Sequence, residues 1–309
     1  MIDIDKVKRY SVLKRKSKVR VSDFASPPEK GRAFLGFWRS LPNILKARDI
    51  RTLADKIAFA RRRKRAVIFM CGAHVIKCGL NPVVIELIKK KVITCLVLNG
   101  AGIIHDFEVA LQARTSEDVA EQLVSGKFGM GRETADFLNN AVSLGVAVGK
   151  GLGESVAEGI AKEKLKYKNL SLLYNAYKHK IPVCVFVAVG TDIIHQHPSF
   201  DACSTGLGSQ RDFKILTENI LGLNNGGVVL NFGSAVILPE VFLKALNLAR
   251  NLRHKVKDFT TANFDMLYHY RPAQNIVSRP VMPAGIGYYI VGHHEIMLPL
   301  LAQAIIEKL

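Results

Sequence analysis

Histidine and aspartate residues cluster just after short apolar runs that are rich in β-branched residues. Such runs are typical of strands buried on both faces of a parallel sheet. Ligands of open α/β sheets bind beyond the carboxyl ends of the strands, so we expect a functional site there. The His and Asp side chains that follow four of these runs are His74, His105, Asp106, Asp192, His195, His197, His293 and His294.

The pair His195 and His197 is the first candidate for chemistry. Alternate side chains of an extended backbone point the same way, so both imidazoles would face one side if this segment is extended. Imidazole exchanges protons near neutral pH, and a carboxylate such as Asp192 can orient it. We predict that His195 or His197 moves a proton, with Asp192 and His105 as the other catalytic residues.

A metal centre is the alternative use of these side chains. Imidazole and carboxylate groups bind zinc or iron, and a bound metal ion would supply hydroxide near neutral pH. The five cysteines include no Cys-x-x-Cys pair, so a structural zinc site is not indicated. A metal-dependent hydrolase therefore stands beside metal-free acid–base chemistry.

Three glycine-containing turns could present backbone N–H groups to an anion. The segment NGAGIIHD (99–106) is the best of them, because it follows a predicted strand and opens a predicted helix. The segments FGMGRET (128–134) and GKGLGES (149–155) lie between predicted helices and lack a P-loop ending. We predict a nucleotide phosphate or ribose beside Asn99, Gly100, Ala101 and Gly102.

Strand and helix patterns alternate along the chain, which predicts a parallel sheet with helices on both faces. The fold class is α/β, a Rossmann-like doubly wound, mostly parallel sheet in a single domain over 41–309, preceded by a basic arm over 1–40. The segment 199–209 is expected to be a loop before a helix at 210–221. Strands are expected at 66–71, 93–98, 183–189, 228–232, 258–264 and 287–291.

Positive charge is concentrated near the N-terminus. The formal net charge is +18, and residues 1–65 hold 20 Lys and Arg against 6 Asp and Glu. Such a stretch can bind nucleic acid or an acidic partner, although a solvated helix end is the favoured explanation. No apolar run reaches the length of a membrane span, and the first residues have no signal-peptide core, so we expect a cytoplasmic chain.

Taken in order, these pieces resemble the deoxyhypusine synthase family from about residue 50 onward. The resemblance implies a Rossmann-like NAD-binding fold and homotetramers with active sites between paired subunits. It places Gly72, His74, Thr261, Ala262, His293 and the 99–106 turn, including Asp106, around an NAD site. The segments that carry it are FMCGAHVIKCGL (69–80), LNGAGIIHDF (98–107), HKIPVCVFVAVGTDI (179–193), GGVVLNFGSAV (226–236), FTTANFD (259–265) and YYIVGHHEIMLPLL (288–301).

The departures from the family concern its NAD site, where His293 replaces an expected aspartate and Ala73-His74 a Ser-Asn pair, and above all its chemistry. The family's imine-forming lysine lies in a motif like Ser-Trp-Gly-Lys, whereas here the matching stretch is Ser278-Arg279-Pro280-Val281. The family's amine pocket is acidic, whereas residues 266–277 contain no carboxylate and include Arg271. The histidine of a family glycine-rich turn falls on Leu238 or Pro239. A pocket with Arg271 and Arg279 cannot hold the polycation spermidine, so we predict that no deoxyhypusine is made.

The sequence thus predicts a divergent deoxyhypusine synthase-like enzyme that binds NAD and acts on a small anionic substrate. Acid–base chemistry by the histidines and Asp192 would carry the reaction, and Arg271 and Arg279 would hold substrate charge. The alternatives are a metal-dependent hydrolase and a non-catalytic binding protein with a basic arm.

Overall fold

A computed structural model describes residues 2–309 of the chain. The chain divides into two compact units, Met1–Arg51 and Thr52–Leu309. In the first unit, the short turns η1 (Ile4–Lys6), η2 (Val12–Lys14) and η3 (Val21–Asp23) precede the helix α1 (Phe34–Ser40). Trp38 is buried and stacks on Phe34. The predicted irregular arm therefore contains one helix, α1, which two stacked aromatic rings stabilise.

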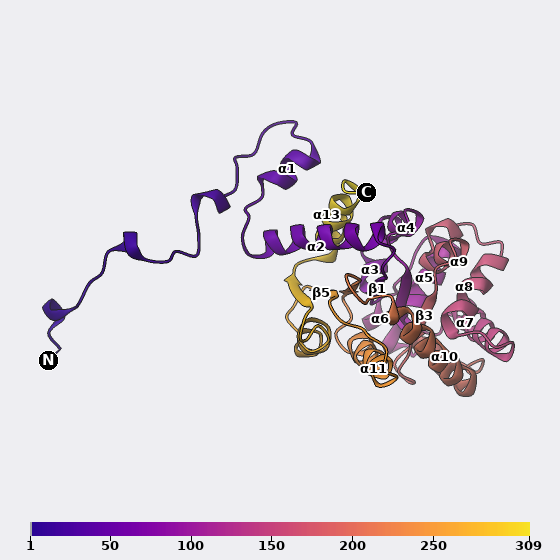
Figure 1. The fold of residues 1–309 in the computed structure, drawn as a ribbon. Coiled ribbons are helices and arrows are strands. Elements are labelled where there is room, and N and C mark those ends of the chain that lie inside the picture. The colour runs from indigo at the N-terminus through magenta and orange to yellow at the C-terminus, as the bar shows by residue number, and fades with distance from the viewer. Residues whose placement is uncertain (1) are drawn as a thin grey trace. The chain divides into compact units, whose positions relative to one another are not determined.

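The second unit is built on a six-stranded sheet in the order β3-β2-β1-β4-β5-β6 (Figure 1). Every neighbouring pair is parallel, which confirms the predicted Rossmann-like fold class. The apolar runs form central strands because both of their faces are covered, as in the fully buried β1. The strands are β1 (Val67–Cys71), β2 (Cys95–Asn99), β3 (Val183–Phe186), β4 (Val228–Phe232), β5 (Thr260–Asp265) and β6 (Ile286–Val291).

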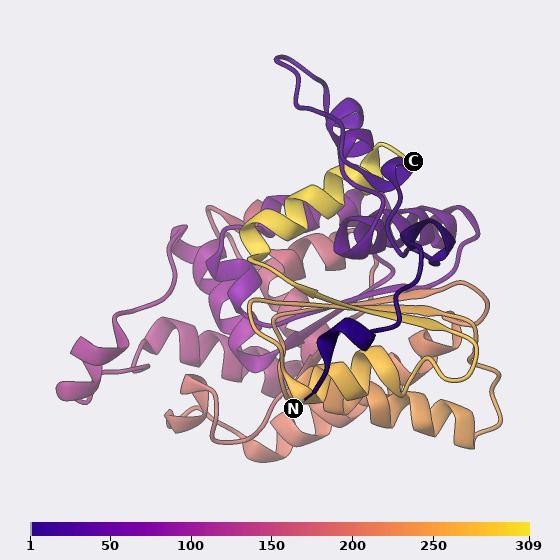
Figure 2. The ribbon, with the colours of Figure 1, turned by 90° about the vertical axis from the view of Figure 1, so that its left-hand side faces the viewer.

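Helices cover both faces of this sheet, and Figure 2 shows the strands nearly edge-on between the two layers. One face packs against α10 and α11, whose apolar side chains, such as Leu216 and Phe242, form the core with Met70 and Val97. The helices are α2 (Leu45–Arg62), α3 (His74–Lys77), α4 (Asn81–Lys89), α5 (Gly100–Gln112), α6 (Val119–Val124), α7 (Arg132–Ala147), α8 (Leu152–Lys162), α9 (Leu172–Lys178), α10 (Ala202–Leu221), α11 (Ile237–Asn251), α12 (Tyr270–Pro272) and α13 (His294–Ile306). The remaining turns are η4 (Lys168–Leu170), η5 (Ile193–Gln196) and the π-helix η6 (Ala273–Ser278).

The predicted loop at 199–209 is wrong, because α10 already begins at Ala202. Asp201 caps the helix by accepting hydrogen bonds from the N–H groups of Cys203 and Ser204. Glycine weakens helices in isolation, but a Cβ on Gly208 would lie 2.9 Å from Val146. Tertiary packing therefore requires a small residue inside this helix and overrides local propensity.

The condition for His195 and His197 to face one side, an extended backbone between them, is not met. Residues 193–196 form the 3₁₀ turn η5, so the two imidazoles point toward different partners. In the part of the chain that the structure describes, no helix combines the length and apolarity that crossing a bilayer needs.

Candidate functional site

A cavity of about 630 Å³ lies beyond the carboxyl ends of β2 and β3. One of its walls is a single face of α5, which follows β2 directly: Ala101, Ile104, His105, Glu108 and Gln112 recur at helical spacing. The connection after β3 supplies Thr191, Asp192 and Ile193. Of the histidines that follow the apolar runs, His105 is the one that lines this cavity.

His105 belongs to a chain of three polar groups inside the cavity. The Thr115 hydroxyl donates to Glu108 Oε2 at 2.5 Å and lies 2.6 Å from His105 Nδ1. A hydroxyl has one hydrogen, and here Glu108 receives it, so the Thr115 oxygen accepts the Nδ1–H of His105. This order leaves Nε2 of His105 as the nitrogen that can take a proton from a ligand.

The surroundings keep His105 neutral. Burial lowers the pKa of His105, nearby Glu108 raises it in part, and Lys77 lowers it further. A neutral imidazole whose other nitrogen is hydrogen-bonded toward a carboxylate can act as a general base. Sequence reasoning selected His105 but missed Glu108 and Thr115, although Glu108 follows His105 by three residues on the same helix face.

Asp192 lies against the N-terminus of α5. The Ala101 N–H forms a hydrogen bond with its carboxylate, and a Cβ on Gly100 would lie 1.9 Å from Asp192 Oδ2. Asn99 caps the same helix by accepting the Gly102 N–H at 3.0 Å. The backbone groups predicted to hold a nucleotide are therefore bonded within the chain, and a nucleotide phosphate beside Gly100 and Gly102 stays a prediction that would require Asp192 to move.

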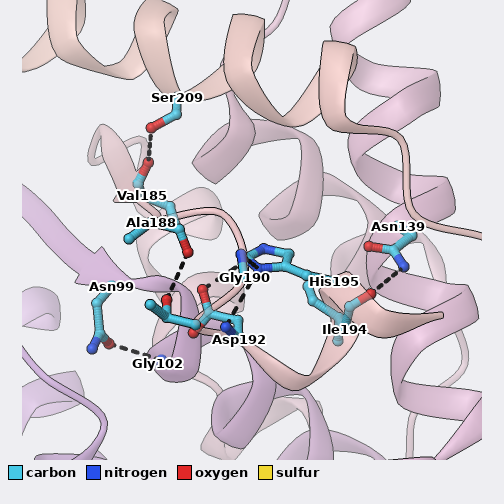
Figure 3. A network of polar contacts seen from close by, with 11 residues as sticks. Asn99, Gly102, Asn139, Val185, Ala188, Gly190, Asp192, Ile194, His195 and Ser209 are labelled. Atoms are coloured by element: carbon cyan, nitrogen blue, oxygen red, sulfur yellow. Dashed lines mark hydrogen bonds and ion pairs between the residues drawn. The ribbon is translucent and has the colours of Figure 1, made fainter.

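His195 holds the Asp192 connection in place (Figure 3). Its Nδ1 accepts the N–H groups of Gly190 at 3.0 Å and of Asp192 at 3.3 Å. The proton of the neutral ring is therefore on Nε2, which lies 3.8 Å from Asp192 Oδ2. Burial lowers the pKa of His195 and raises the pKa of Asp192 to about 6.

These contacts change the roles that we predicted for the two histidines of this segment. One nitrogen of His195 is bonded to backbone and the other faces Asp192, so His195 is arranged to position Asp192, and its transfer of a substrate proton stays a prediction. His197 Nε2 lies 2.7 Å from the Gly129 carbonyl oxygen and donates to it. The two rings diverge because the 3₁₀ turn between them does not preserve the two-residue period of a strand.

Asp106, predicted to contact the cofactor, is instead a buried structural carboxylate. It accepts hydrogen bonds from the Ser171 hydroxyl and from the N–H groups of Leu172 and Leu173 at the start of α9. Asn81 also donates to it, and burial raises the pKa of Asp106 to about 6. Asp106 follows His105 in the helix, so its side chain points about 100° away, into the interior.

The other predicted cofactor residues lie at β1, β5 and β6, apart from the cavity lining. Thr261 and Ala262 are fully buried inside β5, and the Thr261 hydroxyl donates to the Ile276 carbonyl. They are inside the sheet because β5 continues to Asp265, and their contact with a ligand stays a prediction. A Cβ on Gly72 would lie 2.7 Å from the Gly233 carbonyl oxygen, so the turns after β1 and β4 pack closely together.

The three histidines that follow β1 and β6, His74, His293 and His294, do not line the cavity with His105. The His74 ring packs edge-on against buried His294, with 5.5 Å between centroids. His293 is largely exposed and lies 3.7 Å from Glu295.

The arginines predicted to hold substrate charge lie on the connection between β5 and β6. Arg271 Nε lies 3.4 Å from Glu240, and Arg279 donates to Asn275 at 2.9 Å. Neither lines the cavity beside α5. The cationic side chains that do line it are Lys77 and Arg114, which sequence reasoning did not select.

The histidines and carboxylates do not assemble into a metal centre. Across residues 2–309, no group of three or more His, Cys, Asp or Glu side chains is arranged to hold a metal ion. The zinc or iron alternative therefore gains no support.

Comparison of the sequence with protein-family models and with curated proteins gives no match. Solved structures share the fold. A deoxyhypusine synthase-like protein from Entamoeba histolytica has a TM-score of 0.56 at 10% identity, over 92% of this chain and 96% of the other. A LOR/SDH protein from Methanococcus maripaludis S2 has a TM-score of 0.54 at 15% identity, over 85% of this chain and 70% of the other.

AgrE, solved in complex with ornithine and NAD⁺, has a TM-score of 0.54 at 14% identity over 87% of this chain. The cyanobacterial arginine dihydrolase ArgZ has a TM-score of 0.51 at 15% identity. This chain spans about a third of the length of each, 34% and 33%. The fold and the cavity define a Rossmann-like α/β protein similar to deoxyhypusine synthase-like structures, and identities this low extend the likeness to the fold alone.

Proposed function

We propose that this chain is an enzyme that moves a proton on a small anionic molecule bound in the cavity along α5. The observation that carries the proposal is the hydrogen-bonded order Glu108–Thr115–His105, with His105 lining the cavity. In this hydrogen-bonded chain the Thr115 proton points to Glu108 and the His105 proton to Thr115, so His105 Nε2 is free to accept a proton before a ligand binds.

In the proposed reaction, His105 Nε2 takes a proton from a carbon made acidic by a neighbouring carbonyl group of the substrate. The electron pair of the broken C–H bond moves onto the carbonyl oxygen, and the imidazole becomes a cation. Glu108 stabilises that cation through the Thr115 hydroxyl. The proton then returns to the same carbon as the electron pair moves back from the oxygen, so atoms and charge balance without another reactant.

An anionic substrate is proposed because of the charges in the cavity wall. Lys77 and Arg114 form no ion pair among those found within residues 2–309. Glu108 is bonded to Thr115 and Thr134, and Glu117 accepts the Gly129 N–H. The two cations are the positive charges that the wall offers to a ligand, beside the carboxylates Glu108, Glu117 and Asp192, each of which has an oxygen bonded within the chain. They would also stabilise a developing enolate.

NAD has a weaker basis in this chain. AgrE, about a third of which has a similar fold, was solved in complex with NAD⁺. Here, however, the Ala101 and Gly102 N–H groups are bonded to Asp192 and Asn99, and the Gly72 turn is packed against Gly233. The residues do not fit a pyrophosphate while Asp192 is in place, so no step of the proposed reaction passes through a nucleotide.

Deuterium exchange tests the proposal without knowledge of the substrate. The full chain is incubated in D₂O with a panel of small carboxylic and phosphorylated keto acids, and deuterium entering carbon is measured by mass spectrometry. The native chain should catalyse exchange in at least one compound, and His105→Gln should lose about 100-fold or more of that rate.

The matched control is His254→Gln, at an exposed histidine outside the cavity. It should exchange at the native rate. Equal exchange by the native chain and by His105→Gln, or no exchange in any compound, would contradict the proposal.

A further inference from the structure

The N-terminus of α5 has the features of an anion-binding site, and a carboxylate of the same chain lies on it. A 13-residue helix directs its first N–H groups and the positive end of its dipole toward this point. Asp192 approaches so closely that residue 100 has no room for a Cβ. An oxyanion of a ligand would lie where this carboxylate lies.

The position is buried but incompletely satisfied. The side chains of Asp192 and His195 are 7% and 4% exposed. Neither Asp192 Oδ2 nor His195 Nε2 has a hydrogen-bond partner in the described chain. Unpaired buried polar atoms are rare, because each loses its hydration without compensation. Two of them, facing each other at the end of a cavity, indicate that the position is built for a further polar group.

The segment that contains Asp192 can move away from the N-terminus of α5. Within residues 187–198, which we call the Asp192 loop, only Ile194 is fully buried. Gly190 adopts a φ of +94° and, like Thr191, is exposed. Hydrogen bonds, such as those to Phe128, Gly129 and Asn139, hold this loop more than apolar burial does, and water can replace them when the loop withdraws.

We propose that the N-terminus of α5 binds a doubly charged oxyanion, of the phosphate or sulfate class, whose place Asp192 holds until the ligand displaces it. This inference rests on the proposed function in one respect: the oxyanion is taken to be the anionic group of the substrate on which His105 acts. Ala101 and His105 are four residues apart on one face of α5, so the oxyanion would lie about 6 Å along the helix axis from the base. The substrate would then carry its oxyanion two or three bonds from the reacting carbon.

Sulfate is the suitable probe, because its charge stays constant over the working pH range. Sulfate is titrated calorimetrically into the full chain at pH 7.5, in native form and as Asp192→Ser. Removal of the competing carboxylate should tighten sulfate binding about tenfold or more. Asp192→Asn keeps the shape of the side chain without its charge, so its sulfate affinity should lie between those of the native chain and Asp192→Ser. It replaces the serine variant in the test if that variant is unstable.

The matched control is Asp201→Ser. Asp201 also caps a helix, α10, but lies outside the cavity and leaves no buried atom unpaired. Its replacement should leave sulfate affinity at the native value, whatever the basic arm contributes. Equal affinity of the native chain and both Asp192 variants, or tightening in Asp201→Ser as well, would overturn the inference.

Two further arms separate the possible outcomes. His105→Gln added to Asp192→Ser should bind sulfate as tightly as Asp192→Ser alone, so the site can exist even if the proposed proton transfer fails. Competition of bound sulfate with inorganic phosphate and with NAD⁺ then distinguishes a small phosphorylated ligand from a dinucleotide.

Discussion

Asp212 is expected to make the stability of this fold fall as the pH rises. Its Oδ2 accepts the N–H of Gly153 at 2.8 Å and of Val185 at 2.7 Å, and so joins the start of α8 to the edge strand β3. Its Oδ1 is buried without a partner. Burial raises the pKa of Asp212 from 3.8 to about 8, against the smaller opposing effect of the two hydrogen bonds.

The sign follows from proton linkage. Between the unfolded and folded pKa values the native state binds more protons than the unfolded state, so the free energy of unfolding decreases as the pH rises. The stabilisation is fully present below pH 3.8 and is lost as the pH rises through 8. From pH 6 to pH 8 the loss at this one group is about 2 kcal/mol.

Asp212→Asn tests this value, because an amide resembles the protonated acid and can still accept both N–H groups. Urea unfolding of the native chain and of the variant at pH 6, 7 and 8 gives the two free energies of unfolding. Subtracting one free energy of unfolding from the other at each pH cancels the pH dependence that other groups contribute, including Asp106, Asp192 and the buried histidines. The variant should gain about 2 kcal/mol on the native chain between pH 6 and pH 8. A difference that does not change with pH would refute the reasoning.

Three other perturbations test the site. Gly100→Ala places a methyl group on Asp192 and should lower the free energy of unfolding by about 1–3 kcal/mol, measured by urea unfolding, with recovery when Asp192→Ser is added. Thr115→Val breaks the link between His105 and Glu108 and should reduce deuterium exchange about tenfold or more, and an unchanged rate would show that the link has no catalytic role. Because Asp192 is bonded to α5, millimolar NAD⁺ should leave the melting temperature of the native chain unchanged, whereas a shift of several degrees would restore the nucleotide prediction.

The sequence by itself determined the architecture of the second unit. Each apolar run marked a strand, and the helical spacings between runs required parallel crossovers, because local periodicity decides which face of an element is buried. It also located the edge of the sheet where the cavity lies, and it selected His105 and Asp192, both of which line that cavity.

Only the tertiary structure decided which polar groups meet. His197 bonds to Gly129, Asp106 to the start of α9, and His105 to Thr115. Asp192 lies on the helix N-terminus that the glycines had suggested was open to a phosphate. These hydrogen bonds depend on the backbone conformation of the turns and on the direction of each side chain. A pattern of apolar and polar residues specifies neither. A strand end brings a residue to the correct edge of the sheet, but hydrogen-bond partners from distant segments determine whether it faces a ligand or the protein interior.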